Sequence, residues 1–153
     1  MILVSACLAG AEVRYDGGHC LKDIICKLVE DGKAVTVCPE VLGGLSTPRE
    51  PAEIVGGNGN NVLDGKAKVI DITGRDVTEF FLRGAQVVLE KAKQLEVTAV
   101  VLKENSPSCG SIMIYDGDFS GKKIVGNGVT AALLKRNGIR VISDEQFNLE
   151  DIE

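Results

Sequence analysis

Three short apolar segments, residues 2–6, 34–37 and 97–102, each lead into a loop that carries a cysteine. The segments consist mainly of Val, Ile, Leu and Ala, and glycine or proline follows each cysteine closely. Aromatic residues make up only 4% of the chain and Trp is absent, so the core has to be aliphatic. Continuous aliphatic segments of this length are typical of buried strands in a parallel sheet that helices cover.

Amphipathic segments alternate with these strands. The sequence predicts helices over residues 21–31, 76–96 and 128–137, and further strands over residues 67–72, 112–115 and 139–143. Gly32 and Gly138 follow two of the helices as expected of caps. Asp76 and Glu79 have capping-box spacing, and Gly84 predicts close packing of that helix on the sheet. The predicted fold class is α/β, a single domain over residues 1–153 with a mainly parallel sheet and helices on both faces.

A long irregular segment is predicted between residues 39 and 65. Loops of this length in a compact domain are usually functional or disordered. The first half, with paired glycines and a Pro-Arg step at residues 43–49, has a functional composition. The polar stretch 56–61 predicts a mobile tip.

The charge pattern narrows the possible partners. The formal net charge is -5 and the basic residues are scattered, which disfavours nucleic-acid binding. We find no secretory leader and no apolar stretch of bilayer-spanning length, so we expect a cytoplasmic protein without membrane contact. The oligomeric state stays open, with a homo-oligomer among the options.

The cysteines that follow the three strands are expected to share one site. The carboxyl ends of parallel strands lie at one edge of a sheet, and ligands bind in the crevice there. Cys7, Cys38 and Cys109 each follow a predicted strand, and thiols in a reducing compartment favour a soft metal or an iron–sulfur cluster over disulfides. Structural zinc usually takes close-spaced cysteine pairs, which this chain lacks.

Several alternatives remain at this stage. Any single cysteine is more often a buried apolar side chain, and we assign Cys20 and Cys26 to that class. A metal-free cysteine nucleophile needs a base, and His19 is the only imidazole in the sequence. A nucleotide-binding regulator lacks its phosphate fingerprint, because Gly57-Asn58-Gly59 neither follows a predicted strand nor opens a predicted helix. An iron–sulfur or sulfur-carrying module without catalysis is the main non-enzyme alternative.

An ordered set of motifs over nearly the whole chain resembles the thiouracil desulfidase family. The motifs are Cys7-Leu8-Ala9-Gly10, Arg14-Tyr15-Asp16-Gly17, Cys38-Pro39-Glu40, Gly43-Gly44-Leu45, Pro48-Arg49, Ser106-Pro107-Ser108-Cys109-Gly110 and Gly128-Val129-Thr130-Ala131-Ala132-Leu133-Leu134. The resemblance implies a Rossmann-like core and a [4Fe-4S] cluster on Cys7, Cys38 and Cys109. It also implies removal of sulfur from a thiolated nucleobase such as 2-thiouracil, with release of hydrogen sulfide and no net redox change.

The implied chemistry needs a carboxylate that activates water and carries protons. Glu40 is the first choice and Asp16 the second, although Asp16-Gly17 is also a common turn pair. The expected catalytic residues are Glu40, Asp16 and Ser108, and the expected substrate contacts are Ser5, Tyr15, Arg49, Lys103 and Ser106. As an alternative, the hydroxyls of Ser106 and Ser108 bond to the backbone of their own turn. For Arg49 the alternative is an ion pair with Glu50 or Glu53.

Overall fold

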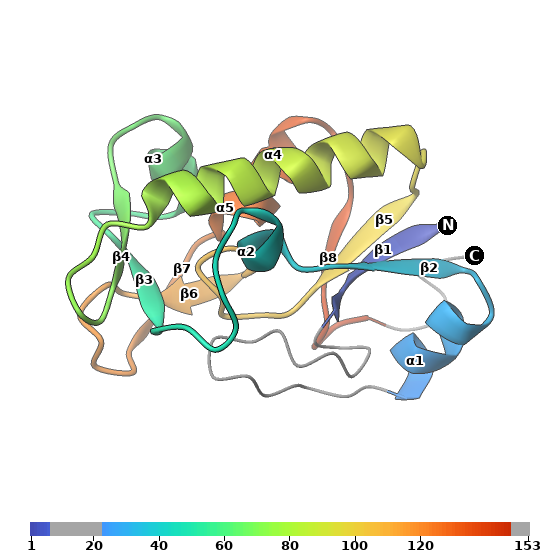
Figure 1. Cartoon of the computed structure of the whole chain (residues 1–153), viewed down its shortest axis with the longest axis horizontal. Helices are drawn as coiled ribbons and strands as arrows, with labels where there is room; N and C mark the ends of the chain where they lie inside the picture. The colour runs from blue at the N-terminus through green and yellow to red at the C-terminus, as the bar shows by residue number, and fades with distance from the viewer. Residues whose placement is uncertain (7–22, 148–153) are drawn as a thin grey trace.

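The computed structural model describes residues 1–6 and 23–147 (Figure 1). The motifs predicted within residues 7–22 therefore lie outside the described residues, and with them Cys7, Tyr15, Asp16, His19 and Cys20. Within the described ranges, no helix has both the length and the apolar character that crossing a bilayer requires.

The central sheet has four parallel strands in the order β2-β1-β5-β8. Its strands are β1 (Ile2–Ser5), β2 (Ala34–Val37), β5 (Ala99–Leu102) and β8 (Val141–Ser143). The register places Ser5 beside Val37 and Leu102 beside Ser143, so the carboxyl ends meet at one edge. The predicted parallel sheet is confirmed, and every residue of β1 and β5 is buried, as their continuous apolar sequence requires.

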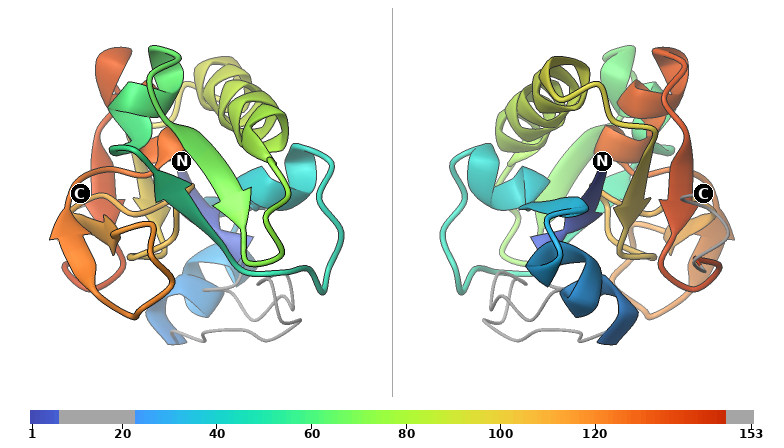
Figure 2. Two further views of the ribbon diagram at one scale, coloured as in Figure 1. Left: turned by 90° about the vertical axis from the view of Figure 1, so that its left-hand side faces the viewer. Right: turned by 90° about the vertical axis from the view of Figure 1, so that its right-hand side faces the viewer.

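Helices cover both faces of this sheet, as predicted (Figures 1 and 2). Helix α1 (Asp23–Glu30) packs Ile25 and Leu28 on the face that carries Ile2 and Val4. On the opposite face, α4 (Thr78–Gln94) and α5 (Val129–Arg136) cover Leu3 and Val100. Each fully buried aliphatic side chain of this kind contributes about 1.5–3 kcal/mol. Gly32 and Gly138 follow α1 and α5 with positive φ angles of 72° and 75°, which confirms both predicted caps.

A second group of elements, here called the hairpin layer, packs beside the sheet under the first turns of α4 (Figure 1). It comprises β3 (Ala52–Val55), α3 (Gly59–Leu63), β4 (Lys68–Asp71), β6 (Met113–Tyr115) and β7 (Lys123–Val125). Strands β3 and β4 pair antiparallel, as do β6 and β7. The strands predicted at 67–72 and 112–115 are present, whereas β3 and β7 were not predicted.

The predicted mobile tip at residues 56–61 is wrong, because helix α3 begins there. The Asn58 side chain accepts hydrogen bonds from the backbone N–H groups of Asn60 (3.0 Å) and Asn61 (3.4 Å). In return the Asn61 side chain accepts from the Asn58 N–H at 2.9 Å, which completes a capping box. Asn58 and Asn61 form the capping box that Ser or Thr and Glu usually form. The start of the helix was therefore not recognised in this polar stretch.

Two details predicted for the long helix are also wrong. The expected Asp76–Glu79 capping box is absent from the described contacts, because Asp76 accepts from the N–H and hydroxyl of Thr78 instead, at 3.0 and 2.6 Å. Gly84 does allow close packing, but its partner is the short helix α2 (Pro39–Leu42) rather than the sheet. A Cβ at Gly84 would collide with the Pro39 carbonyl.

Candidate functional site

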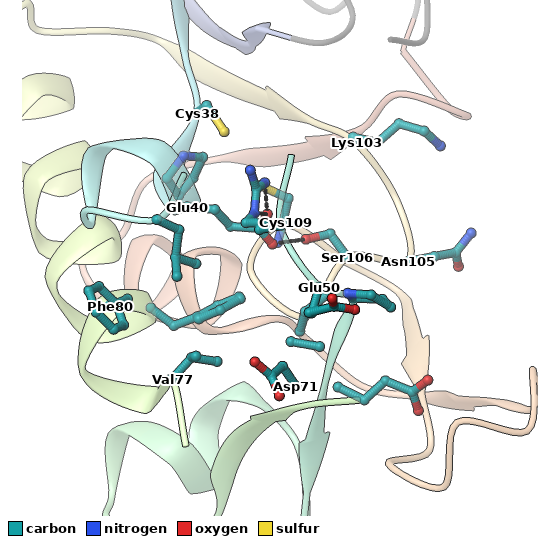
Figure 3. A pocket seen from close by; sticks show the side chains of 18 of the residues that line it. Cys38, Glu40, Glu50, Asp71, Val77, Phe80, Lys103, Asn105, Ser106 and Cys109 are labelled. Carbon is teal, nitrogen blue, oxygen red and sulfur yellow. Dashed lines mark hydrogen bonds and ion pairs between the residues drawn. The ribbon is translucent and has the colours of Figure 1, made fainter. Parts of the chain in front are cut away.

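A cavity of about 900 Å³ lies at the carboxyl edge of the sheet, between the sheet and the hairpin layer (Figure 3). From β1 the chain crosses to β2 on one side and later to β5 and β8 on the other. This reversal makes the crevice between β1 and β5 a topological switch point, the usual place for a ligand in such sheets. Its size suits a small-molecule ligand.

Two thiols line this cavity. Cys38 directly follows β2 and caps the start of α2, and Cys109 lies in the turn after β5. Burial, the largest influence, raises the pKa of the Cys38 thiol above its ordinary value, and a hydrogen bond from the Val41 backbone offsets only part of this effect. At neutral pH the ligand-free protein therefore holds Cys38 as a thiol, which disfavours the metal-free nucleophile at this position.

Ser5 joins the ends of β1 and β5 beside the thiols. Its hydroxyl accepts a hydrogen bond from the Lys103 N–H at 3.0 Å and donates to the Cys109 sulfur at 4.0 Å. The side chain lines the cavity but is only 3% exposed. Its observed contacts are thus with the protein, where the sequence predicted a contact to substrate.

Glu40 and Arg49 form a partly buried ion pair in the same wall. The Glu40 Oε2 atom accepts from both Nε (3.0 Å) and Nη2 of Arg49, and the arginine and glutamate side chains are 8% and 14% exposed. Arg49 also donates to the Ser46 carbonyl and the Thr47 hydroxyl, each at 3.1 Å. The alternative prediction that Arg49 pairs with Glu50 or Glu53 is wrong, because α2 brings Glu40 within reach of the guanidinium group.

The serines of the Cys109 turn have different surroundings. The Ser106 hydroxyl accepts from the N–H groups of Ser108 (3.0 Å) and Cys109 (3.2 Å), and it donates to Glu40 Oε1 at 3.5 Å. Ser108 is fully buried, with its hydroxyl 2.7 Å from the Thr130 hydroxyl on α5. Ser106 therefore lies in the site, whereas Ser108 is absent from the described residues that line the cavity.

Lys103 lies where β5 ends, and its ammonium is 3.8 Å from the Asp144 carboxylate, next to the end of β8. The side chain is 22% exposed and lines the cavity. It is therefore a partly accessible cation at the sheet edge with a carboxylate partner that the sequence did not predict, and its contact to substrate stays a prediction.

Sequence reasoning missed the far wall of the cavity and one buried acid. The far wall is formed by side chains of α4 and the hairpin layer, among them Val77, Phe80, Tyr115 and Phe119. Figure 3 shows Val77, Phe80 and Asp71 at the end of the cavity away from Cys38. Glu104, in the stretch after β5, is 4% exposed and takes up hydrogen bonds from the Cys109 turn. In the sequence, the only sign that Glu104 belongs to the site is its position close to the end of a predicted strand.

The donor set fits a soft metal. Cys38 and Cys109 present sulfur to one cavity, and Ala6, the residue before Cys7, lines the same cavity. Sulfur ligands select iron–sulfur clusters, zinc or copper over hard cations. Within residues 1–6 and 23–147, no group of three His, Cys, Asp or Glu side chains comes together around one metal position, and the third predicted ligand, Cys7, lies outside these ranges.

A parallel α/β fold with thiols at its switch point defines a Rossmann-like protein with a sulfur-lined ligand site. The chain belongs to the 2-thiouracil desulfurase family, whose sequence model matches residues 2–146. This confirms the family resemblance read from the motifs.

Two relatives extend this finding. The uncharacterized protein YbbK of Bacillus subtilis (strain 168) is 60% identical over 148 residues, which cover 97% of this chain and 98% of YbbK. The solved structure of the [4Fe-4S]-dependent thiouracil desulfidase TudS is 43% identical and superimposes with a TM-score of 0.85. That match covers 99% of this chain and 93% of TudS, and it confirms the Rossmann-like α/β fold.

Proposed function

We propose that this protein is a [4Fe-4S]-dependent desulfidase that removes sulfur from a thiolated nucleobase such as 2-thiouracil. The observation that carries the proposal is the presence of Cys38, Cys109 and the partly buried Glu40 carboxylate in the wall of one cavity. Membership of the desulfurase family and similarity to TudS support it.

Cys7, Cys38 and Cys109 would hold the cluster. When bound, a cluster with three cysteine ligands supplies one iron without a protein ligand, a Lewis acid for the sulfur of the substrate. The cavity beside the two described thiols offers room for the thiolated nucleobase.

Glu40 is the proposed acid and base. Its carboxylate accepts a proton from a water molecule that attacks the thiolated ring carbon, and it returns a proton to the departing sulfur. The carbon–sulfur double bond is replaced by a carbon–oxygen double bond whose oxygen comes from the water. Both protons of that water end on the departing sulfur, the first through Glu40 and the second from the hydroxyl group added to the ring carbon, so hydrogen sulfide leaves and no electron donor is needed. Arg49 and Ser106 hold the two carboxylate oxygens in place.

Other residues contribute to binding. Lys103, which lines the cavity at the sheet edge, is the proposed contact for a substrate oxygen. Asp16 stays the second candidate for the acid–base role and Tyr15 a candidate substrate contact. Ser5 and Ser108 we assign to the protein framework around Cys109, since their hydroxyls bond to Cys109 and Thr130.

The alternative of a sulfur-carrying module without catalysis needs no substrate-sized cavity and no carboxylate beside the ligands. The cavity of about 900 Å³ that includes Glu40 in its wall favours catalysis over this alternative.

Anaerobic reconstitution with iron and sulfide tests the proposal. The wild type is expected to bind about four irons per chain, and Cys7→Ala, Cys38→Ala and Cys109→Ala are each expected to lose them. Cys26→Ala is the matched control, because Cys26 lies on α1 and is not among the described lining residues. Loaded wild type should then release sulfide and uracil from 2-thiouracil, and Glu40→Gln should not. A wild type without cluster, or cysteine variants that keep it, would contradict the proposal.

A further inference from the structure

The turn that carries Cys109 is closed at its base by the carboxylate of Glu104. Among the described residues, four backbone N–H groups and one hydroxyl of the segment 104–113 donate to this carboxylate, from both ends of the segment, and the Ser143 side chain adds a further hydrogen bond. The donors are the N–H groups of Asn105 (3.3 Å), Ser111 (3.0 Å), Ile112 (3.1 Å) and Met113 (3.1 Å), and the Ser111 hydroxyl (3.1 Å). One side chain thus accepts from several backbone N–H groups that the turn itself does not pair.

The closed turn is also attached to the sheet and to α5. The Glu104 N–H donates to Asp144 Oδ1 at 2.8 Å, next to the end of β8. At the other side, the carbonyls of Pro107 and Ser108 accept from the N–H groups of Val129 and Thr130, each at 2.8 Å. Cys109 therefore sits on a segment that is held at its base, by Glu104, and near its tip, by the first turn of α5.

Glu104 is suited to this role because it keeps its charge. Burial is the largest single influence and acts to raise the pKa of Glu104, but hydrogen bonds from the N–H groups of Ile112, Met113 and Asn105 and from the Ser143 side chain together hold the pKa below its ordinary value. Lys135 adds a cation nearby and donates to the Ser111 carbonyl at 2.8 Å. Hydrogen bonds to an ionised carboxylate are about twice as strong as neutral ones.

We propose that Glu104 is the positioning residue for the Cys109 ligand. It holds the turn in the geometry in which the Cys109 sulfur faces the cavity, and so slows loss of the bound cluster. The inference rests on the proposed function, because it takes Cys109 as a cluster ligand. Residues that orient metal ligands commonly change metal affinity by about 10-fold or more when they are replaced.

Glu53 provides a matched comparison within the same chain. It is 8% exposed, and its Oε1 atom accepts from the N–H groups of Gly117 (2.9 Å) and Phe119 (3.2 Å) in the turn between β6 and β7. Its chemistry is therefore that of Glu104, but the turn that it holds carries none of the proposed cluster ligands. Loss of either carboxylate should destabilise the fold, and only loss of Glu104 should affect the cluster.

The test compares the wild type, Glu104→Gln and Glu53→Gln after anaerobic reconstitution. We measure iron loss to an excess of chelator at a temperature at which all three cluster-free proteins are folded, and the electron paramagnetic resonance spectrum of the reduced cluster. Glu104→Gln is expected to lose iron about 10-fold faster than the wild type, with a changed spectrum. Glu53→Gln is expected to keep the wild-type rate and spectrum.

Equal rates of iron loss for Glu104→Gln and Glu53→Gln would overturn the role of Glu104 and leave the proposed function intact. A wild type that takes up no cluster would overturn both. If Glu104→Gln does not fold, Ser111→Ala decides, because it removes only the hydroxyl donor to Glu104. Faster iron loss from Ser111→Ala than from Glu53→Gln supports the inference, and a wild-type rate overturns it.

Discussion

The two described cysteine turns reach the same sheet edge by different means. The Cys109 turn is held mainly from within, by hydrogen bonds from its own backbone to Glu104 and Ser106. The Cys38 turn is held from outside, by the packing of α2 on α4 and by the Glu40–Arg49 pair. We therefore expect substitutions in distant helices to affect the Cys109 turn little, and substitutions in α4 to affect the Cys38 turn strongly.

The largest effect is expected where packing holds the Cys38 turn. In Gly84→Val the new side chain would collide with the Pro39 carbonyl, so α2 and Cys38 must move away from α4. We expect a loss of about 3 kcal/mol in the free energy of unfolding, measured by urea denaturation. Gln86→Ala, at an exposed position of the same helix, should stay within about 0.5 kcal/mol of wild type. A Gly84→Val protein of wild-type stability would refute the packing account.

A somewhat smaller effect is expected for the Glu40–Arg49 pair. A double-mutant cycle with Glu40→Gln and Arg49→Met isolates the coupling between the two side chains in the cluster-free protein. Because the pair is largely buried, we expect a coupling energy of about 1–3 kcal/mol from chemical denaturation. The double variant should lose less stability than the sum of the losses in the two single variants. Each single variant leaves one largely buried charge without its partner, whereas the double variant removes both charges. Additive effects would show that the pair does not hold the Cys38 turn.

The smallest of these effects concerns pH and the Cys109 turn. Because the pKa of Glu104 is lower in the folded chain than its ordinary value of 4.5, its ionised form stabilises the fold above that value. This contribution should disappear as the pH falls through the folded-state pKa. Glu104→Gln should therefore be less stable at neutral pH and lose less stability on acidification.

Unfolding free energies measured between pH 7 and acid conditions would test this. Ser111→Ala is the control, because it keeps the carboxylate with one donor fewer and should keep the wild-type pH slope. Parallel curves for wild type and Glu104→Gln would contradict this role of the Glu104 carboxylate.

Sequence patterns predicted the sheet, the helices that cover it and the placement of Cys38 and Cys109, because these depend on local periodicity and on where strands end. Strand ends in a parallel sheet meet whatever the intervening loops contain. The patterns did not predict α3, because an asparagine pair formed its capping box. The role proposed for Glu40 comes from its position two residues after Cys38, which periodicity does not encode, and it stays a prediction.

Which side chains become partners was decided only by the tertiary structure. Arg49 pairs with Glu40 instead of Glu50 or Glu53, Gly84 faces α2 instead of the sheet, and Ser5 reaches Cys109 across 104 positions of sequence. A sequence pattern reports whether a side chain is buried relative to its own helix or strand. It does not report which distant group lies opposite, because that depends on how separate elements approach one another and compete for the same space.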